Sequence, residues 1–311
     1  MQEIHVTKMF FCLTLDKSRK KNAYQYYCSF FRGLKNFYYF CTPKKAILKM
    51  KSNICKNLLM LLGFALYFIG RLAIFPCADG QKHSFYHMTR PAFLDATDFR
   101  MLWNWFVAFI LMIGIMLLMH KPNKIWGELG LADKRFCQSI GIGFLFTLPM
   151  FIVNAICGEL DFTWTAIGIS LMAGVCEEVY FRGYFFGQLF RNCRWGFIPA
   201  SLITSLLFGL LHLYQGYDIT SSLLAVLVTG LGGILYSWMY VEWNYRLWIP
   251  ISLHTFMDVA WMILPVGEEG YGAAGNMATN AGRAITIVLA IGATIYFKHK
   301  RGEKCFNFKM I

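Results

Sequence analysis

Long hydrophobic runs alternate with short polar connections along most of this chain. An α-helix rises about 1.5 Å per residue, so a run of about 18 residues or more can cross about 30 Å of hydrocarbon. The pattern predicts an all-α fold, a polytopic bundle of about eight membrane-spanning helices. The predicted spans are residues 57–76, 100–120, 138–157, 163–189, 196–214, 222–241, 247–265 and 282–298.

Composition supports this interpretation and argues against a soluble protein. The chain is 57% hydrophobic and only 15% charged, whereas ordinary soluble domains are about 45–50% apolar and about 25% charged. One soluble core could not bury so much apolar surface. The lipid bilayer is therefore the first partner that the sequence predicts.

The formal net charge of +13 does not indicate a nucleic-acid partner, because Lys and Arg are concentrated outside the hydrophobic runs. They gather in the N-terminal region, in the connections after the second, fourth and sixth spans, and in the C-terminal tail. Cytoplasmic segments of membrane proteins carry this excess. We therefore expect a multi-pass protein of the cell membrane with both termini in the cytoplasm.

Three parts are expected along the chain. Residues 1–56 form a basic, aromatic extension that is cytoplasmic or interfacial, residues 57–298 form the transmembrane bundle, and residues 299–311 form a basic cytoplasmic tail. The segment that follows Met50 also resembles an ordinary basic start before a first span. Whether residues 1–49 belong to the native product therefore stays open.

The fourth span carries three ionisable residues in an otherwise apolar segment, AGVCEEVYFRGYFFGQLF. Such groups are costly inside a membrane and are retained when they are paired or functional. Glu178 and Arg182 stand four residues apart with the acid first, which favours an ion pair. Glu177 has no cation on its own turn, which suits a general base that accepts a proton from water.

Two later spans add histidines. The fifth contains FGLLH, which places Phe208 and His212 one turn apart. The seventh contains HTFMD, which places His254 and Asp258 one turn apart, so that the carboxylate could orient the imidazole. Each His could instead be an ordinary interhelical hydrogen-bonder. Because the other spans carry almost no ionisable residues, the three sets together favour a common site.

The order EExxxR, FxxxH and HxxxN or HxxxD on successive spans resembles the CPBP family, which comprises type II CAAX prenyl endopeptidases and bacteriocin-processing or immunity relatives. The resemblance implies that Glu177 and His212 activate the attacking water and that Glu178 with Arg182 supports the site. It also implies that His254 and Asp258 line the region where the oxyanion forms. The resemblance covers about residues 163–265, the expected protease core, and many members carry Asn where this chain has Asp258.

The resemblance leaves metal dependence open, since the family is often labelled as metalloproteases. Glu177, His212 and His254 are the candidate ligands, and such a set can hold Zn²⁺ with a position open for water. There is no HExxH motif, and a Glu/His mechanism needs no ion. The absence of GxGD and of GxSG before the histidines argues against aspartyl and rhomboid-type mechanisms.

The predicted span ends conflict with a common site. They place His212 near the outer end of its helix and His254 nearer the cytoplasmic end, about 10–15 Å apart in depth at about 1.5 Å per residue. Later helix starts at Pro199 and Pro250 would bring His212 deeper, because Pro favours the first helical turn.

The sequence favours an intramembrane endopeptidase that acts on a membrane peptide or a lipidated protein. A prenylated C-terminus, a bacteriocin leader and a membrane regulatory peptide all remain open as substrates. Two other classes also stay open. One is a non-enzymatic membrane protein that binds a toxic peptide or a partner and confers immunity, and the other is a transporter that uses the carboxylates as a proton relay.

Overall fold

The computed structural model describes residues 43–72, 74–76, 82–84, 89, 97–267 and 274–305. The chain divides into two units, residues 1–55 and 56–311, and the description below concerns the second. The predicted extension at 1–56 lies mostly outside the described residues, as does the end of the predicted tail.

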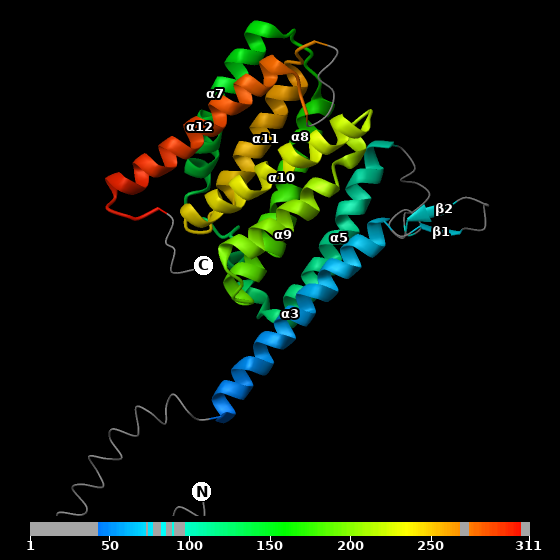
Figure 1. The fold of residues 1–311 in the computed structure, drawn as a ribbon, viewed down its shortest axis with the longest axis vertical. Coiled ribbons are helices and arrows are strands. Elements are labelled where there is room, and N and C mark those ends of the chain that lie inside the picture. Colours follow the sequence, from blue (N-terminus) through cyan, green and yellow to red (C-terminus); the bar gives the residue numbers. More distant parts are fainter. Residues whose placement is uncertain are drawn as a thin grey trace, which may run out of the picture. The chain divides into compact units, whose positions relative to one another are not determined.

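Eight long helical segments dominate the described residues, in agreement with the predicted all-α bundle (Figure 1). They are α3 (Pro43–Leu72), α5 (Thr97–Met119), α7 (Phe136–Cys157), α8 (Trp164–Glu178) with its continuation, α9 (Phe197–Leu210), α10 (Ile219–Glu242), α11 (Trp248–Ile263) and α12 (Met277–Lys300). Shorter pieces are η2 (Pro122–Lys124), α6 (Ile125–Leu129), η5 (Leu213–Gln215) and the paired strands β1 (Ile74–Pro76) and β2 (Lys82–Ser84).

Five of these helices are long and apolar enough to cross a membrane by length and composition. They are Ser52–Leu72 within α3, Leu102–Met119 within α5, and α7, α10 and α12. The three segments that carry the candidate site do not meet this criterion. α9 has 14 residues and rises about 21 Å, short of the about 30 Å of hydrocarbon. The site helices are therefore shorter or more polar than the pattern of eight full spans predicted.

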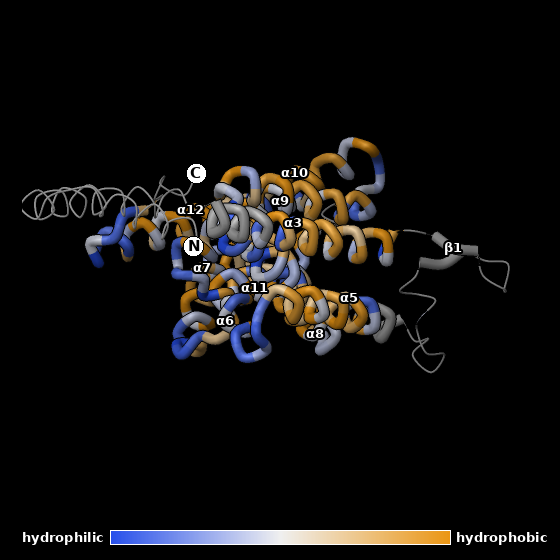
Figure 2. The backbone as a smooth tube through the Cα atoms, turned by 90° about the horizontal axis from the view of Figure 1, so that it is seen from below, coloured by the Kyte–Doolittle hydropathy of each residue, from blue (hydrophilic) through white to orange (hydrophobic). Residues whose placement is uncertain are grey.

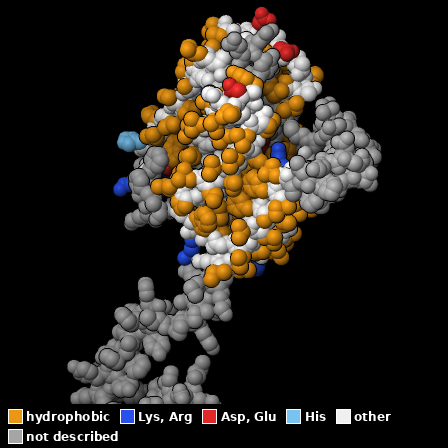
Figure 3. Space-filling view, turned by 45° about the vertical axis from the view of Figure 1, so that its right-hand side comes forward, with side chains coloured by type: hydrophobic (Ala, Val, Ile, Leu, Met, Phe, Trp, Pro, Cys, Tyr) orange, Lys and Arg blue, Asp and Glu red, His pale blue; other side chains and the backbone are white. Residues whose placement is uncertain are grey.

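The surface agrees with a protein that sits in lipid. Figure 2 shows hydrophobic residues along α3, α5 and α10 and hydrophilic residues around α6. The face drawn in Figure 3 is covered mainly by hydrophobic side chains. Large apolar residues are exposed in rows on single helices, including Leu223, Leu227 and Leu231 on α10. In water such a surface would be unfavourable, but lipid tails solvate it well.

Helix packing places α11 at the centre of the site. α11 packs against both α7 and α8, while α12 packs on α7 and α9 packs on α10. Glycines allow the close approach of α11 to its neighbours. A Cβ atom at Gly143 would lie 1.8 Å from Ser252 Oγ, and one at Gly174 would lie 2.1 Å from Thr255 Oγ1. Only glycine fits at these two crossings, as in other membrane helix contacts.

The fourth helix changes its winding directly after the two glutamates. α8 ends at Glu178, and two π-helical segments follow, η3 (Val179–Phe186) and η4 (Gln188–Asn192). Every residue of η3 is buried. π-Helical turns are rare, and those that occur are often at functional sites. This segment is therefore part of the bundle core and also indicates a functional site.

The prolines do not delay their helices. α9 begins at Phe197 and α11 at Trp248, two residues before Pro199 and Pro250, so the expected later starts are wrong. Proline lacks an N–H, and the first helical turn has no acceptor for that N–H, so proline is tolerated within the turn without having to begin it.

Candidate active site

One carboxylate oxygen joins two helices at the centre of the bundle. Glu178 Oε1 accepts a hydrogen bond from Arg182 Nη1 at 2.9 Å and lies 2.7 Å from His254 Nδ1 on α11. The side chains of Glu178 and Arg182 are 0% and 2% exposed. A carboxylate only accepts hydrogen bonds, so Nδ1 of His254 is the donor in the second contact. The expected pair of Glu178 and Arg182 is present and extends to His254.

Aromatic rings enclose the cation of this cluster. The guanidinium carbon of Arg182 lies 4.4 Å from the centre of the Phe208 ring and 5.2 Å from that of Tyr236. Gly233 on α10 leaves the space that this arrangement needs, because a Cβ there would lie 3.2 Å from Arg182 Nη2 and 2.7 Å from Ser205 Oγ. Cation–π contacts are stronger in a desolvated setting such as this one.

His254 has a carboxylate at each ring nitrogen. Its Nε2 lies 3.5 Å from Asp258 Oδ2, and its ring stacks on Tyr236 with the centroids 5.3 Å apart. The contact with Asp258 is longer than the contact with Glu178. Glu178 is therefore the closer group that orients the imidazole, whereas the spacing of four residues had suggested Asp258 for this role.

His212 lies just beyond its helix rather than on it. α9 ends at Leu210, and His212 belongs to the turn that follows. Its Nδ1 is 2.8 Å from the backbone oxygen of Phe208. A carbonyl oxygen can only accept, so Nδ1 carries the proton, and Nε2 of the neutral ring keeps its lone pair. The hydrogen bond satisfies a carbonyl at the helix end, where the ladder has no further donor.

Glu177, His212, His254 and Asp258 line one cavity of about 930 Å³. Glu177 and His254 both lie within electrostatic range of the His212 ring. The depth conflict therefore does not separate them. Among the residues that the structure describes, none forms a hydrogen bond with the Glu177 carboxylate, which leaves it able to bind water or substrate in the cavity.

Two arginines near the cavity were not identified from the sequence. Arg71 on α3 donates to the Tyr67 hydroxyl at 3.1 Å, lies 5.8 Å from the centre of the Trp105 ring, and attracts Glu177. Arg283 on α12 lines the cavity itself. Glu177 thus has a cation near it, but one from another helix. Both arginines could have been identified from the sequence, because each is a charged residue at the edge of, or inside, an apolar run.

The expected metal ligands do not form a metal site in this arrangement. Among the described residues, no three His, Cys, Asp or Glu side chains are placed to hold a metal ion together. In the set Glu177, His212 and His254, His212 keeps Nε2 available because only its Nδ1 contacts a carbonyl, but His254 directs both of its nitrogens to carboxylates. These residues therefore do not fit Zn²⁺ as a three-ligand site.

Comparison with known proteins gives one match. Residues 142–260 match a family model described as Rce1-like, type II CAAX prenyl endopeptidase Rce1-like. No curated protein and no solved structure matches the chain significantly. The matched residues include all of α8, α9 and α10 and all six residues expected at the site. The family indicates an intramembrane CAAX-type endopeptidase in general terms. The match and the order of the motifs support membership of the CPBP family for the Rce1-like part of this membrane protein, residues 142–260.

Proposed function

We propose that this protein cleaves a membrane-associated peptide or a lipidated C-terminal segment, with a water molecule activated by Glu177 and His212. The observation that carries the proposal is that the Glu177 carboxylate and the His212 imidazole line one cavity. Glu177 lies on α8 and His212 in the turn after α9, so a water between them would have an acceptor on each side.

The tautomer of His212 supports its proposed role beside Glu177. Its Nδ1–H is used by the Phe208 carbonyl, so Nε2 is the nitrogen that can accept a proton. Glu177 removes one proton from the water as the oxygen attacks the scissile carbonyl carbon. A positioned general base contributes about 10²–10⁴ in rate. The proton then passes to the leaving amine as the C–N bond breaks.

The second cluster stabilises the developing negative charge. His254 is fixed through Nδ1 by Glu178, which Arg182 holds in turn. The carboxylates at both ring nitrogens favour the doubly protonated ring, whose Nε2–H, beside Asp258 in the cavity, can donate to an oxyanion. Preorganised donors of this kind are commonly the largest single contribution to catalysis. Glu178 and Arg182 act as positioning residues, and Asp258 sets the field around Nε2.

We place this activity in the cell membrane, in a multi-pass chain with both termini in the cytoplasm. The hydrophobic helices and the cavity among them support a substrate that reaches the site from the bilayer. A prenylated C-terminus agrees best with the Rce1-like family that residues 142–260 match, and a bacteriocin leader or regulatory peptide is the alternative substrate. The reaction as proposed uses only side chains and water.

The test uses the full chain in lipid nanodiscs with a farnesylated CAAX-type peptide, and mass spectrometry detects the products. Glu177→Gln should reduce cleavage at least about 100-fold, because the amide cannot act as the base. Glu159→Gln, an exposed position before α8, is the matched control and should cleave as the original chain does. Retained turnover by Glu177→Gln would rule out this base.

Two outcomes would favour the other classes. If the chain protects cells from a toxic peptide equally well with Glu177→Gln and cleaves nothing, it is a binding protein that confers immunity. If it moves protons together with a solute across liposome membranes in a manner that depends on Glu177, it is a transporter. No feature of the described residues favours either class over hydrolysis.

A further inference from the structure

The wall of the cavity formed by α12 carries a cation that the proposed chemistry does not use. Arg283 and Asn280 both line the cavity and stand three residues apart, which places them on neighbouring turns of one helix face. Both lie beyond the residues that match the family model, which end at residue 260. This wall can therefore differ between members whose catalytic helices are alike.

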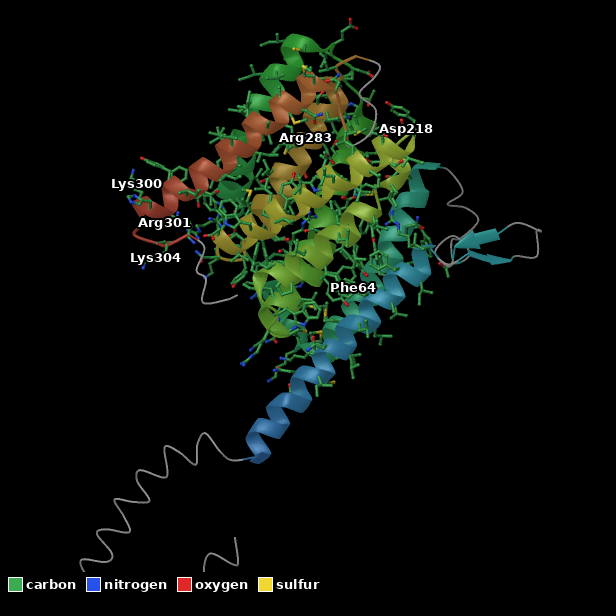
Figure 4. The ribbon with its side chains drawn as sticks, viewed as in Figure 1. Phe64, Asp218, Arg283, Lys300, Arg301 and Lys304 are labelled. Carbon is green, nitrogen blue, oxygen red and sulfur yellow. The ribbon has the colours of Figure 1, made fainter. Side chains whose placement is uncertain are left out.

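The surroundings of Arg283 hold its guanidinium at the cavity. Its central carbon lies 4.9 Å from the centre of the Trp261 ring on α11, and it attracts Asp258 electrostatically. Asp258 makes its ion-pair contact with His254. Figure 4 shows Arg283 on α12 well away from the helix end that bears Lys300 and Arg301. Its position on the cavity wall thus separates it from the exposed basic tail.

The cavity presents two acids to any ligand, Glu177 and Asp258, and most of its other lining is apolar. An anionic ligand would be repelled by these acids unless a cation lay nearby. A guanidinium offers a planar fork of N–H donors that matches a carboxylate in two parallel hydrogen bonds. Peptides carry carboxylates at their C-terminus and on Asp and Glu side chains.

We propose that Arg283 is a specificity-determining residue that binds a carboxylate of the peptide substrate. The proposal rests on the proposed peptide hydrolysis and adds a requirement that the hydrolysis alone does not impose. Arg283 interacts with a group away from the scissile bond, so it changes which peptide is bound and cleaved. The acids Glu177 and Asp258 make this selection sharper, because without Arg283 they disfavour an anionic peptide more than a neutral one.

The experiment compares one farnesylated peptide as its free C-terminal carboxylate and as its carboxamide. Dissociation constants are measured in nanodiscs in the Glu177→Gln background, so that binding is read without turnover, and kcat/KM is measured in the original chain. The free carboxylate should be preferred by about tenfold to a hundredfold, the range expected of a charged hydrogen-bonded pair. Arg283→Met should remove this preference and leave the carboxamide nearly unchanged.

Two further peptides identify the source of the carboxylate. Both are carboxamides, and they differ only in Asp or Asn as the last residue. A preference for the Asp peptide that Arg283→Met removes assigns the site to acidic side chains, whereas a preference confined to the free C-terminus assigns it to the terminal carboxylate. Arg283→Lys should keep part of the preference, since the charge remains but the two-pronged geometry does not.

Lys300→Met on the same helix is the control for the loss of one positive charge and should leave every ratio unchanged. If Arg283→Met does not fold, Arg283→Gln and Arg283→Lys carry the comparison. Equal binding of all four peptides, binding of none, or a preference that survives the loss of Arg283 would overturn the proposal. Cleavage that depends on Glu177 would still support the proposed hydrolysis in those cases.

Discussion

Glu178 Oε1 lies 2.7 Å from His254 Nδ1, and these two atoms connect the glutamate pair on α8 to the histidine on α11. The same oxygen accepts from Arg182. A histidine whose Nδ1–H is held by a carboxylate has its ring plane and the direction of its Nε2 fixed. The contact therefore determines where the second nitrogen can act in the cavity.

Removing this carboxylate should destabilise the fold. Glu178→Ala leaves the buried Arg182 guanidinium without its partner and frees His254, and breaking a buried pair from one side costs about 3–5 kcal/mol. Thermal unfolding in detergent should show a clearly lower midpoint. Glu303→Ala, which breaks an exposed pair with Arg301, should change the midpoint little. Equal shifts for the two variants would contradict the structural role of Glu178.

Glu177 and His212 should behave as one unit in kinetics. If both act on the same water, Glu177→Gln and His212→Asn should each lower kcat/KM by about 10²–10⁴. The double variant should then be only slightly slower than the slower single variant, because residues that act as a unit are not additive. The measurement is cleavage of the farnesylated peptide under single-turnover conditions. Losses that multiply would mean that the two residues serve separate steps.

The crossing of α8 and α11 should tolerate no side chain at Gly174. In Gly174→Ala the new Cβ would meet Thr255 Oγ1 and the Thr255 backbone nitrogen at 2.1 and 2.9 Å, so the two helices must separate and His254 must move from Glu178. Both stability and cleavage should fall.

Gly168 on the same helix provides the matched control. A Cβ at Gly168 meets no atom within 4 Å, and alanine in a helix is favoured over glycine by about 1 kcal/mol. Gly168→Ala should therefore leave cleavage unchanged and raise the unfolding midpoint slightly. If Gly174→Ala cleaves normally, close contact at this crossing is not required for the site.

Acidic pH should weaken the ion pair between Asp133 and Arg246, which lies in the connections between helices. Arg246 Nε lies 2.8 Å from Asp133 Oδ2. Burial raises the pKa of the Asp133 carboxyl. Hydrogen bonds from Ser139, Arg246 and the Arg135 backbone together lower it by more than burial raises it, so the pKa of Asp133 lies below its ordinary value. A lowered pKa stabilises the fold above the unfolded pKa of about 3.9, and that stabilisation is lost as the pH falls through the folded value.

Asp133→Asn measures this contribution. The difference in unfolding midpoint between the original chain and this variant should be largest at neutral pH and should shrink below about pH 4. Asp161→Asn, in an exposed connection, is the control and should give a small difference that changes little with pH. If the difference in unfolding midpoint between the original chain and Asp133→Asn stays constant down to pH 3, the charge of the Asp133 carboxylate does not contribute to stability.

The sequence by itself determined the helices and most of the candidate chemistry. Apolar runs must form helices in lipid, because every backbone N–H and C=O group needs a partner within the segment. Ionisable residues inside those runs then stand out by their cost, and so Glu177, Glu178 and His254 could be singled out without any structure. The pair of Glu178 and Arg182 follows from the spacing of four residues on one helix.

Only the tertiary structure decided how the helices present these groups. Spacing within one helix suggested Asp258 as the partner that orients His254, but the packing of α11 on α8 brings Glu178 closer. The end of α9 at Leu210 places His212 in a turn, and the last helix brings Arg283 to the cavity. Contacts between helices depend on crossing points set by residues such as Gly174, and no periodicity within a single helix encodes which residues meet there.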